Sequence, residues 1–209
     1  MAEDFNATAS TLIGEKRLSE AKALLEKALA EKPPDWRPVQ TGGEDEFFYF
    51  WDMAEFLAYC AQVQPEGKGR VVWVHGSYSR ACYLLAYVAI EERDPQAAFQ
   101  ALQKGLELEP DHPHLWCEMG HLLQLLRRHE DALQCYQRAE SARAWASPQQ
   151  KGRALRGQGL SLIDLGRLDE AEQAFQRSLE AEPNHPNALH ELGYIAHLRQ
   201  QQAGGPAAN

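Results

Sequence analysis

The sequence predicts an all-α protein built as a solenoid of stacked helix pairs, because one pattern of small and aromatic residues recurs at a nearly fixed period. Segments 115–139 and 155–178 align with each other, and each contains two amphipathic helical patterns. The second-helix alanine recurs from Ala98 to Ala132, a step of 34 residues. Several positions that repeat together in register indicate one helix pair copied along the chain.

The recurring residues resemble the tetratricopeptide-repeat (TPR) family, whose unit of about 34 residues places an aromatic residue, a Leu-Gly pair, two alanines around an aromatic residue and a closing proline at fixed offsets. Trp116, Met119 and Gly120 take the first-helix places of one unit. The other matches are Ala132, Tyr136 and Ala139 in its second helix, Gly159, Gly166, Ala171, Phe175 and Pro183 in the next unit, and Ala86, Ala98, Leu102, Gly105 and Pro110 in the preceding one. The resemblance covers nearly the whole chain, whose layout is similar to that of bacterial TPR proteins of no assigned function. It implies a right-handed superhelix in which the first helices line a concave groove.

The small residues at these offsets have a physical role. Two paired helices approach closely only where Gly or Ala leaves room for the backbone, and a proline after the second helix prevents its continuation. Gly120 and Gly159 are therefore expected where the helices of a unit touch.

Two breaks in the period divide the chain. The step from Ala132 to Ala171 is 39 residues, so extra residues are inserted at a joint near 141–150, and Ala21 lies 77 residues before Ala98, more than two periods. The expected segments are a degenerate N-terminal repeat at 1–35, an insertion at 36–78, TPR units at 79–112, 113–151 and 152–184, a C-terminal capping helix at 185–199 and a disordered tail at 200–209. Only the second helix of the degenerate repeat is recognisable in the sequence.

The insertion at 36–78 is predicted to hold one helix and one extended segment. Aromatic and small residues recur at i, i+3 and i+4 spacing, so a helix is expected over 44–63, with Phe50 and Trp51 on its core face. Segment 71–75 is rich in valine and is predicted to be extended, with no second strand nearby in the sequence to pair with it.

That extended segment has to be anchored by its side chains. We hypothesise that Trp73 packs against the edge formed by Tyr83 and Tyr87, so that the segment closes one end of the groove or imitates a bound peptide. The alternative is a linker that covers the core.

The composition of the chain restricts the classes of partner that it is expected to bind. The formal charge of −9 and a sequence pI of about 5.4 mean that the average field repels a phosphate backbone. No apolar run approaches the roughly 18 residues of a membrane span, and the first residues lack the basic and apolar regions of a secretory signal. We therefore expect neither nucleic acid nor membrane as a partner, and a cytoplasmic location. The cysteines form no C-x-x-C pair and are expected to be reduced and buried: Cys60, Cys82, Cys117 and Cys135.

No catalytic signature is present: the sequence lacks a nucleophile elbow, a phosphate loop and a dinucleotide fingerprint, and its acidic residues fall mostly on outer helix faces. The pairs His114/His121 and His190/His197 are spaced i, i+7, whereas zinc sites on helices use i, i+4 pairs with a further ligand. We expect a non-enzymatic protein without cofactor or metal, and keep a metal protein or an enzyme as a less favoured alternative.

The resemblance implies that fixed positions of each first helix face the groove, and these positions hold Tyr, Arg and His with a few aliphatic residues, which is typical of a recognition surface. The predicted peptide-binding residues are Arg80, Tyr83, Leu84, Tyr87, His114, Cys117, Glu118, His121, Gln124, Arg153, Arg156, Leu160, His190 and Tyr194. We expect the groove to bind another protein or peptide, which would make the chain a scaffold, an adaptor or a dedicated chaperone. The alternative is a structural oligomer whose groove or open end is filled by a second copy.

The best-known peptide mode of the TPR family clamps a C-terminal carboxylate with Lys, Asn, Asn, Lys and Arg side chains from three units. Arg153 stands at one matching place, but Ser10, Leu84 and Gly157 depart from the pattern. The resemblance therefore does not extend to the complete clamp.

Overall fold

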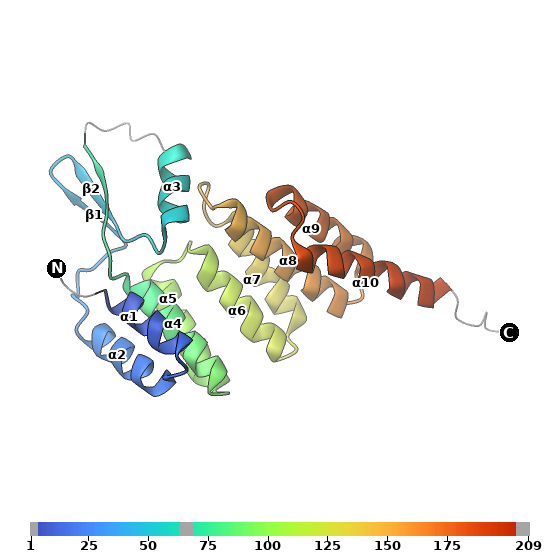
Figure 1. Ribbon diagram of the computed structural model, residues 1–209, viewed down its shortest axis with the longest axis horizontal. Helices are drawn as coiled ribbons and strands as arrows, with labels where there is room; N and C mark the ends of the chain where they lie inside the picture. Colours follow the sequence, from blue (N-terminus) through green and yellow to red (C-terminus); the bar gives the residue numbers. More distant parts are fainter. Residues whose placement is uncertain (1–3, 63–68, 204–209) are drawn as a thin grey trace.

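The computed structural model describes residues 4–62 and 69–203, and its helices stack in pairs along one axis (Figure 1). The pairs are α1 (Phe5–Gly14) with α2 (Leu18–Ala30), α4 (Tyr78–Glu91) with α5 (Pro95–Leu108), α6 (Pro113–Leu125) with α7 (His129–Ser141), and α8 (Pro148–Asp164) with α9 (Leu168–Ala181), followed by α10 (Pro186–Ala203). This arrangement confirms the predicted TPR-like α-solenoid.

The start of several helices is encoded locally. The Asp94 side chain accepts a hydrogen bond from the backbone N–H of Ala97 at 3.0 Å, at the start of α5. Ser147 and Gln150 form a reciprocal capping box at the start of α8, directly after the inserted joint. A proline follows each of these caps, where a missing N–H costs no helical hydrogen bond. The sequence thus restarts the helical pattern after the joint.

Glycine at the repeated first-helix position makes room for an aromatic ring from the paired helix. A Cβ atom added at Gly120 would lie 2.9 Å from the ring of Tyr136, and one added at Gly159 would lie 2.5 Å from the ring of Phe175. Both contacts are shorter than real Cβ atoms make, which confirms that these glycines sit where paired helices touch. At the equivalent Gly193 of α10, no atom lies within 4 Å of the added Cβ.

These glycines give a matched pair of stability predictions. Gly120→Leu should lower the free energy of unfolding by about 1–3 kcal/mol, because the added side chain overpacks the contact with Tyr136. Gly193→Ala should raise it by about 0.5–1 kcal/mol, because the position is open and alanine is the better helix former. Thermal and urea unfolding measure both; equal shifts in the same direction would contradict the assigned register.

The predicted helix over 44–63 is wrong in its first half. The chain instead forms a hairpin of β1 (Val39–Gly42) and β2 (Asp45–Phe48), and only α3 (Met53–Gln62) is helical. Gly43 enters the hairpin turn with φ +67°, a conformation that glycine adopts without strain. The aromatic run that follows suits a strand as well as a helix, and the hairpin decides in favour of the strand.

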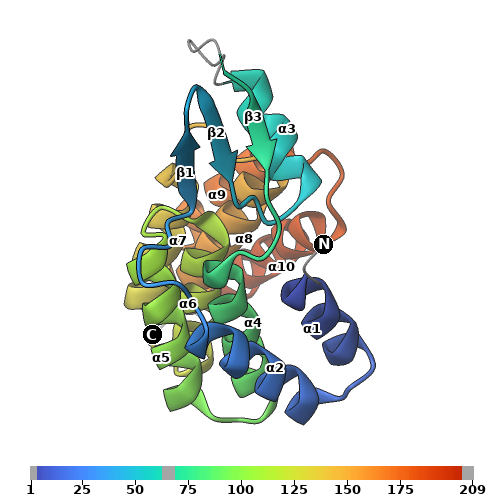
Figure 2. The same ribbon diagram turned by 90° about the vertical axis from the view of Figure 1, so that its left-hand side faces the viewer.

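The expectation that the valine-rich segment has no partner strand is wrong for the same reason. Strand β3 (Val71–Trp73) pairs in parallel with β2, which gives a sheet of order β1-β2-β3 (Figure 2). At its ends, the Glu46 N–H donates to the Arg70 carbonyl at 2.9 Å and the Val74 N–H donates to the Phe48 carbonyl at 2.8 Å. The backbone of the extended segment is therefore held by residues that were expected to be helical.

The two ends of the chain also differ from the prediction. The N-terminal repeat has both helices, and α1 and α2 pack on α4 through buried Ala9, Leu25 and Ala81. At the other end α10 continues to Ala203, so residues 200–203 are helical and not part of a disordered tail. The rest of the predicted tail, 204–209, lies outside the described residues.

Candidate functional site

The first helices of successive pairs form one side of the solenoid, where α4 contacts α6 and α6 contacts α8. Between α6, α8 and α10 this side is hollowed into a pocket of about 430 Å³. Its lining consists of His121, Gln124, Tyr136, Arg153, Arg156, Gly157, Leu160, Phe175, Asn187, His190 and Glu191. We call this pocket the open half of the groove.

Polar side chains in the open half are held in place by partners within the chain. Tyr136 donates its hydroxyl to Gln124 at 2.7 Å, and the amide of Gln124 donates to Ser161 at 3.1 Å. Arg156 forms an ion pair with Glu182 at the end of α9. The surface is therefore ordered before any ligand arrives.

Arg153 is neutralised inside the groove. Its guanidinium donates to Glu118 at 2.6 Å and approaches the Nδ1 atom of His114 at 3.3 Å. Burial by itself would raise the pKa of Glu118, but hydrogen bonds from His121 and Arg153 and the charge of Arg153 hold that pKa below its ordinary value. Glu118 thus stays a carboxylate and already occupies the arginine.

The other half of the groove, beside α4 and the start of α6, is filled by Trp51 from the insertion. The Trp51 side chain stacks on the imidazole of His112 with ring centroids 3.6 Å apart and packs against Tyr83 at 5.2 Å. Its carbonyl accepts a hydrogen bond from Arg80, and its indole N–H donates to Ser79 at 3.2 Å. Only 4% of Trp51 remains exposed. We call this region the filled half of the groove.

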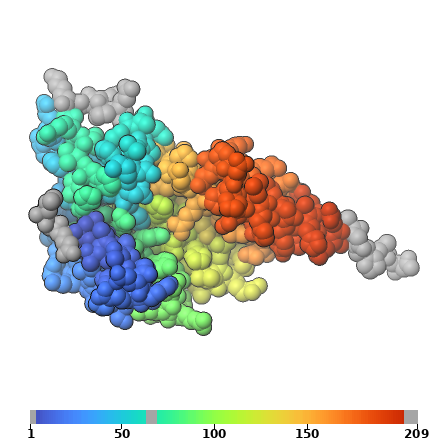
Figure 3. Space-filling view, in the orientation of Figure 1, coloured from blue at the N-terminus to red at the C-terminus, as the bar shows by residue number. Residues whose placement is uncertain are grey.

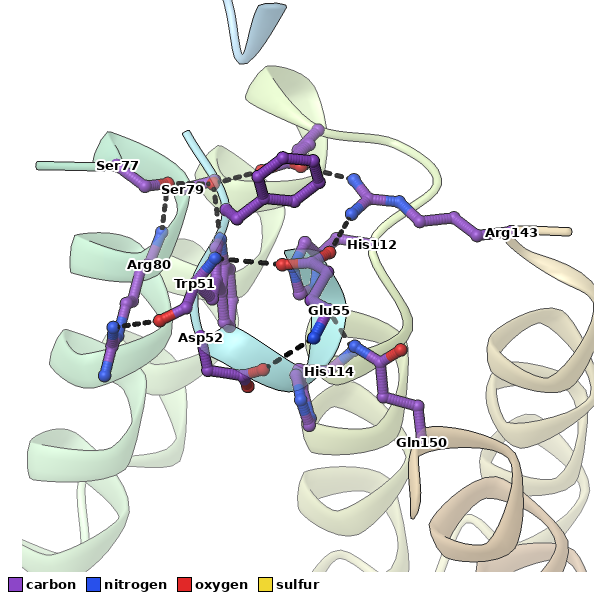
Figure 4. A network of polar contacts seen from close by, with 12 residues as sticks. Trp51, Asp52, Glu55, Ser77, Ser79, Arg80, His112, His114, Arg143 and Gln150 are labelled. Carbon is purple, nitrogen blue, oxygen red and sulfur yellow. Dashed lines mark hydrogen bonds and ion pairs between the residues drawn. The ribbon is translucent and has the colours of Figure 1, made fainter. Parts of the chain in front are cut away.

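A buried network of charged groups fastens the insertion beside Trp51 (Figure 4). Arg143 forms ion pairs with Glu55 of α3 and with Glu109 at the end of α5, and approaches Asp111 at 3.2 Å. Glu55 also accepts the backbone N–H of Trp51 at 2.9 Å. Arg143, Glu55 and Glu109 are each less than a tenth exposed, so these charges depend on one another for neutralisation.

The two breaks in the repeat period meet in space. Arg143 and Trp145 come from the inserted joint, while Glu55 and Tyr59 come from the insertion, and the rings of Tyr59 and Trp145 lie 5.2 Å apart, edge to face. In Figure 3 the teal atoms of α3 lie against the yellow-orange atoms of the joint. The extra residues of the joint therefore form the surface on which the insertion packs.

The structure divides the predicted site residues into four groups. His121, Gln124, Arg153, Arg156, Leu160 and His190 line the open half, Arg80, Tyr83 and His114 contact Trp51 in the filled half, and Tyr87 and Tyr194 lie outside both sets of contacts. Leu84, Cys117 and Glu118 are buried, so Leu84 and Cys117 contribute to the core and present no surface to a ligand.

The hypothesis that Trp73 packs against Tyr83 and Tyr87 is wrong in its residue. Trp73 stacks on Phe56 and donates its indole N–H to the Phe50 carbonyl at 2.9 Å, within the insertion. Trp51 makes the contact with Tyr83 instead. Sequence reasoning placed Trp51 on a core face and missed Glu55 and Arg143; the one signal for them was the pair of register breaks.

Cysteine labelling tests which of the four cysteines are buried. Cys82, Cys117 and Cys135 are buried, and burial raises the pKa of their thiols to about 12, about 12 and about 11, respectively. Cys60 is exposed, so the expectation that all four cysteines are buried is wrong for Cys60. A thiol reagent in native buffer should modify one cysteine quickly and three only after denaturation. Cys60→Ser should remove the fast phase; fast labelling that survives in this variant would contradict the burial of the other three.

Among residues 4–62 and 69–203, no cluster of three or more His, Cys, Asp or Glu side chains is arranged to hold a metal ion. Across the same residues, no helix has the length and apolar character needed to cross a membrane.

Solved structures of similar fold include Pseudomonas aeruginosa pilF and the type IV pilus biogenesis factor PilW. Both are 17% identical to this chain with a TM-score of 0.67; the first match covers 98% of this chain and 76% of pilF, the second 95% of this chain and 70% of PilW. The first TPR of Spaghetti (RPAP3), bound to an HSP90 peptide, is 20% identical with a TM-score of 0.53 over 58% of this chain and 93% of that one. At these identities the likeness shows a shared fold: a solenoid of TPR-like helix pairs.

Family models agree with the fold. Tetratricopeptide-repeat models match residues 79–112, 117–186 and 156–205, more than half of the chain. The chain belongs to the tetratricopeptide-repeat family. No curated protein sequence matches it.

Proposed function

We propose that this chain is a non-enzymatic scaffold that holds a segment of another polypeptide in the open half of its groove, as an adaptor or a dedicated chaperone. The observation that carries the proposal is the pocket of about 430 Å³, which lies in the range of ligand sites in proteins. Its side chains are ordered by hydrogen bonds within the chain, so little entropy is lost when a ligand binds. The Spaghetti TPR, which has a similar fold, is a structure with a bound peptide.

The chemistry of the open half favours a segment of mixed character over a carboxylate terminus. Arg153 and Arg156 are already paired with Glu118 and Glu182, so an incoming carboxylate would have to replace an existing ion pair. The exposed side chain of Leu160, 40% accessible, offers an apolar contact in the same pocket. Hydrogen-bonding side chains around a small apolar patch suit an internal peptide segment with alternating apolar and polar residues.

Capture from an extract of the source cell tests this proposal. Wild-type protein, Leu160→Arg and the matched control Leu125→Arg are immobilised, and the retained proteins are identified by mass spectrometry. Leu125 is also an exposed leucine, 57% accessible, but it lies at the end of α6 and does not line the pocket. We expect a set of proteins retained by wild type and by Leu125→Arg and lost with Leu160→Arg. Identical retention by all three would contradict binding in the open half.

The second candidate, a structural oligomer, is favoured by the open end of the solenoid. No residue covers Gly193, and Leu189 on α10 is 49% exposed, so the face where a paired helix would lie is bare among the described residues. Size-exclusion chromatography with light scattering over a hundredfold range of concentration separates the candidates. A constant monomer mass would exclude the oligomer, and a mass that rises with concentration in wild type but not in Leu189→Lys would support it.

We also propose a cytoplasmic location. The cysteines of the protein form no disulfide, as is usual in reducing compartments. Fractionation of the source cell with detection of the untagged protein tests this, and recovery in a secreted or membrane fraction would contradict it.

A further inference from the structure

We propose that the segment around Trp51 is a built-in ligand of the groove, which blocks a second polypeptide-binding site in the filled half. The site accepts an aromatic side chain carried on a non-helical segment, and the insertion has to leave before such a partner enters. The filled half is separate from the open half, so binding there does not depend on binding in the open half.

The contacts of Trp51 are those of a bound peptide residue. Arg80 of α4 donates to its main-chain carbonyl, and Ser79 of α4 accepts its indole N–H. The ring lies between Tyr83 of one helix pair and His112 of the next. The solenoid thus supplies a side-chain donor for the main-chain carbonyl, an acceptor for the indole N–H and an aromatic slot, which is a complete recognition site for one aromatic residue.

The insertion is joined to the solenoid through side chains. Strands β1, β2 and β3 pair with one another, and within the described residues α3 runs alongside none of the solenoid helices (Figures 1 and 2). Its side-chain contacts with the solenoid include Trp51 in the slot, Glu55 with Arg143 and His112, Tyr59 with Trp145, and Trp36 with Tyr78. A part held by a few side-chain contacts opens at a lower free energy than helices packed along their length.

Release of the insertion leaves the repeats intact. In a solenoid each helix pair is stabilised by its immediate neighbours, and α6 with α7 and α8 with α9 pack on one another without help from α3. The slot residues Tyr83 and His112 stand on α4 and on the cap of α6, so the slot persists when Trp51 is withdrawn. The filled half is then free for an aromatic residue from another chain.

A peptide supplied in trans tests the slot. The probe is a fluorescein-labelled peptide with the sequence of residues 49–56, and its control carries alanine in place of the tryptophan. We expect the probe to bind the full-length Trp51→Ala variant at least tenfold more tightly than wild type, and the alanine peptide to bind neither. Trp116→Ala is the matched control: Trp116 is half-buried and lies outside both halves of the groove, so this variant should bind the probe no better than wild type.

Circular dichroism establishes that Trp51→Ala retains its helices. Absence of probe binding by the folded variant, or equal binding by the variant and wild type, would overturn the proposal. Should the variant fail to fold, hydrogen exchange of wild type decides: amides of α3 should exchange through an opening at least a hundredfold more frequent than that of α9. Exchange of α3 only through global unfolding, together with α9, would overturn it.

Discussion

Replacing Arg143 by Met should reduce the protection of the α3 amides against hydrogen exchange by a factor that corresponds to about 3–5 kcal/mol. Arg143 is the cation between Glu55 and Glu109, and all three side chains are buried. Methionine preserves much of the volume but leaves two carboxylates without their counter-charge, which is the costly way to break a buried ion pair. The loss is limited to the free energy that holds the insertion on the solenoid.

Two further variants show whether charge or geometry is responsible. Arg143→Lys keeps the charge but loses the fork that contacts both carboxylates, so an intermediate loss is expected. Arg128→Met breaks the exposed ion pair between Arg128 and Asp131, which should cost at most about 1 kcal/mol. Unchanged protection of α3 in Arg143→Met, with α9 as the internal reference, would show that the ion pairs do not hold the insertion.

Acidification from pH 7 to pH 5 should destabilise the wild-type protein by about 2 kcal/mol more than a His112→Gln variant. His112 is fully buried, and burial lowers its pKa from about 6.5 to about 3, with Glu109 opposing that change and Arg143 adding to it. Between these two pKa values the unfolded chain binds a proton that the folded chain does not. The stabilisation from neutral His112 is therefore complete above about pH 6.5 and is lost progressively as the pH falls toward 3.

The difference in stability between wild type and His112→Gln isolates the effect of the His112 imidazole from that of other groups that titrate in the same pH range. The charged or titratable side chains around His112 are Glu55 at 3.4 Å, Glu109, Asp111, Arg143, Arg80 and His114. Their contributions are present in both proteins and cancel to first order in the difference. Urea unfolding at several pH values measures this difference in the free energy of unfolding. The control is His190→Gln, because the His190 side chain is 77% exposed. Parallel pH profiles for wild type and His112→Gln would contradict a neutral buried imidazole.

The repeat architecture followed from the sequence because its determinants are local. The spacing of Ala98, Ala132 and Gly159 encodes helix faces, and each helix contacts mainly the next one along the chain. Gly120 and Gly159 could be assigned to the helix contact for the same reason, since the aromatic ring above each comes from the helix that follows directly.

Much of the open half of the groove was also predictable. Once the register of the repeat is known, positions such as His121, Gln124 and Arg153 face the concave side by geometry alone. What the register could not show is which of these groups are already engaged. The pairing of Arg153 with Glu118 joins residues 35 apart in sequence and required the packed structure.

The conformation and the position of the insertion depend on tertiary contacts. An aromatic run such as Phe47–Phe48 suits a helix or a strand, and its pairing with β1 on one side and with the more distant β3 on the other selects the strand. The contact of Arg143 with Glu55 spans 88 residues of sequence. Sequence by itself determined the repeating helix pairs and the face they present, because those depend on neighbours along the chain. Only the tertiary structure decided that Trp51 fills half of that face, because the residues that hold it come from separate units and meet only after the chain has folded.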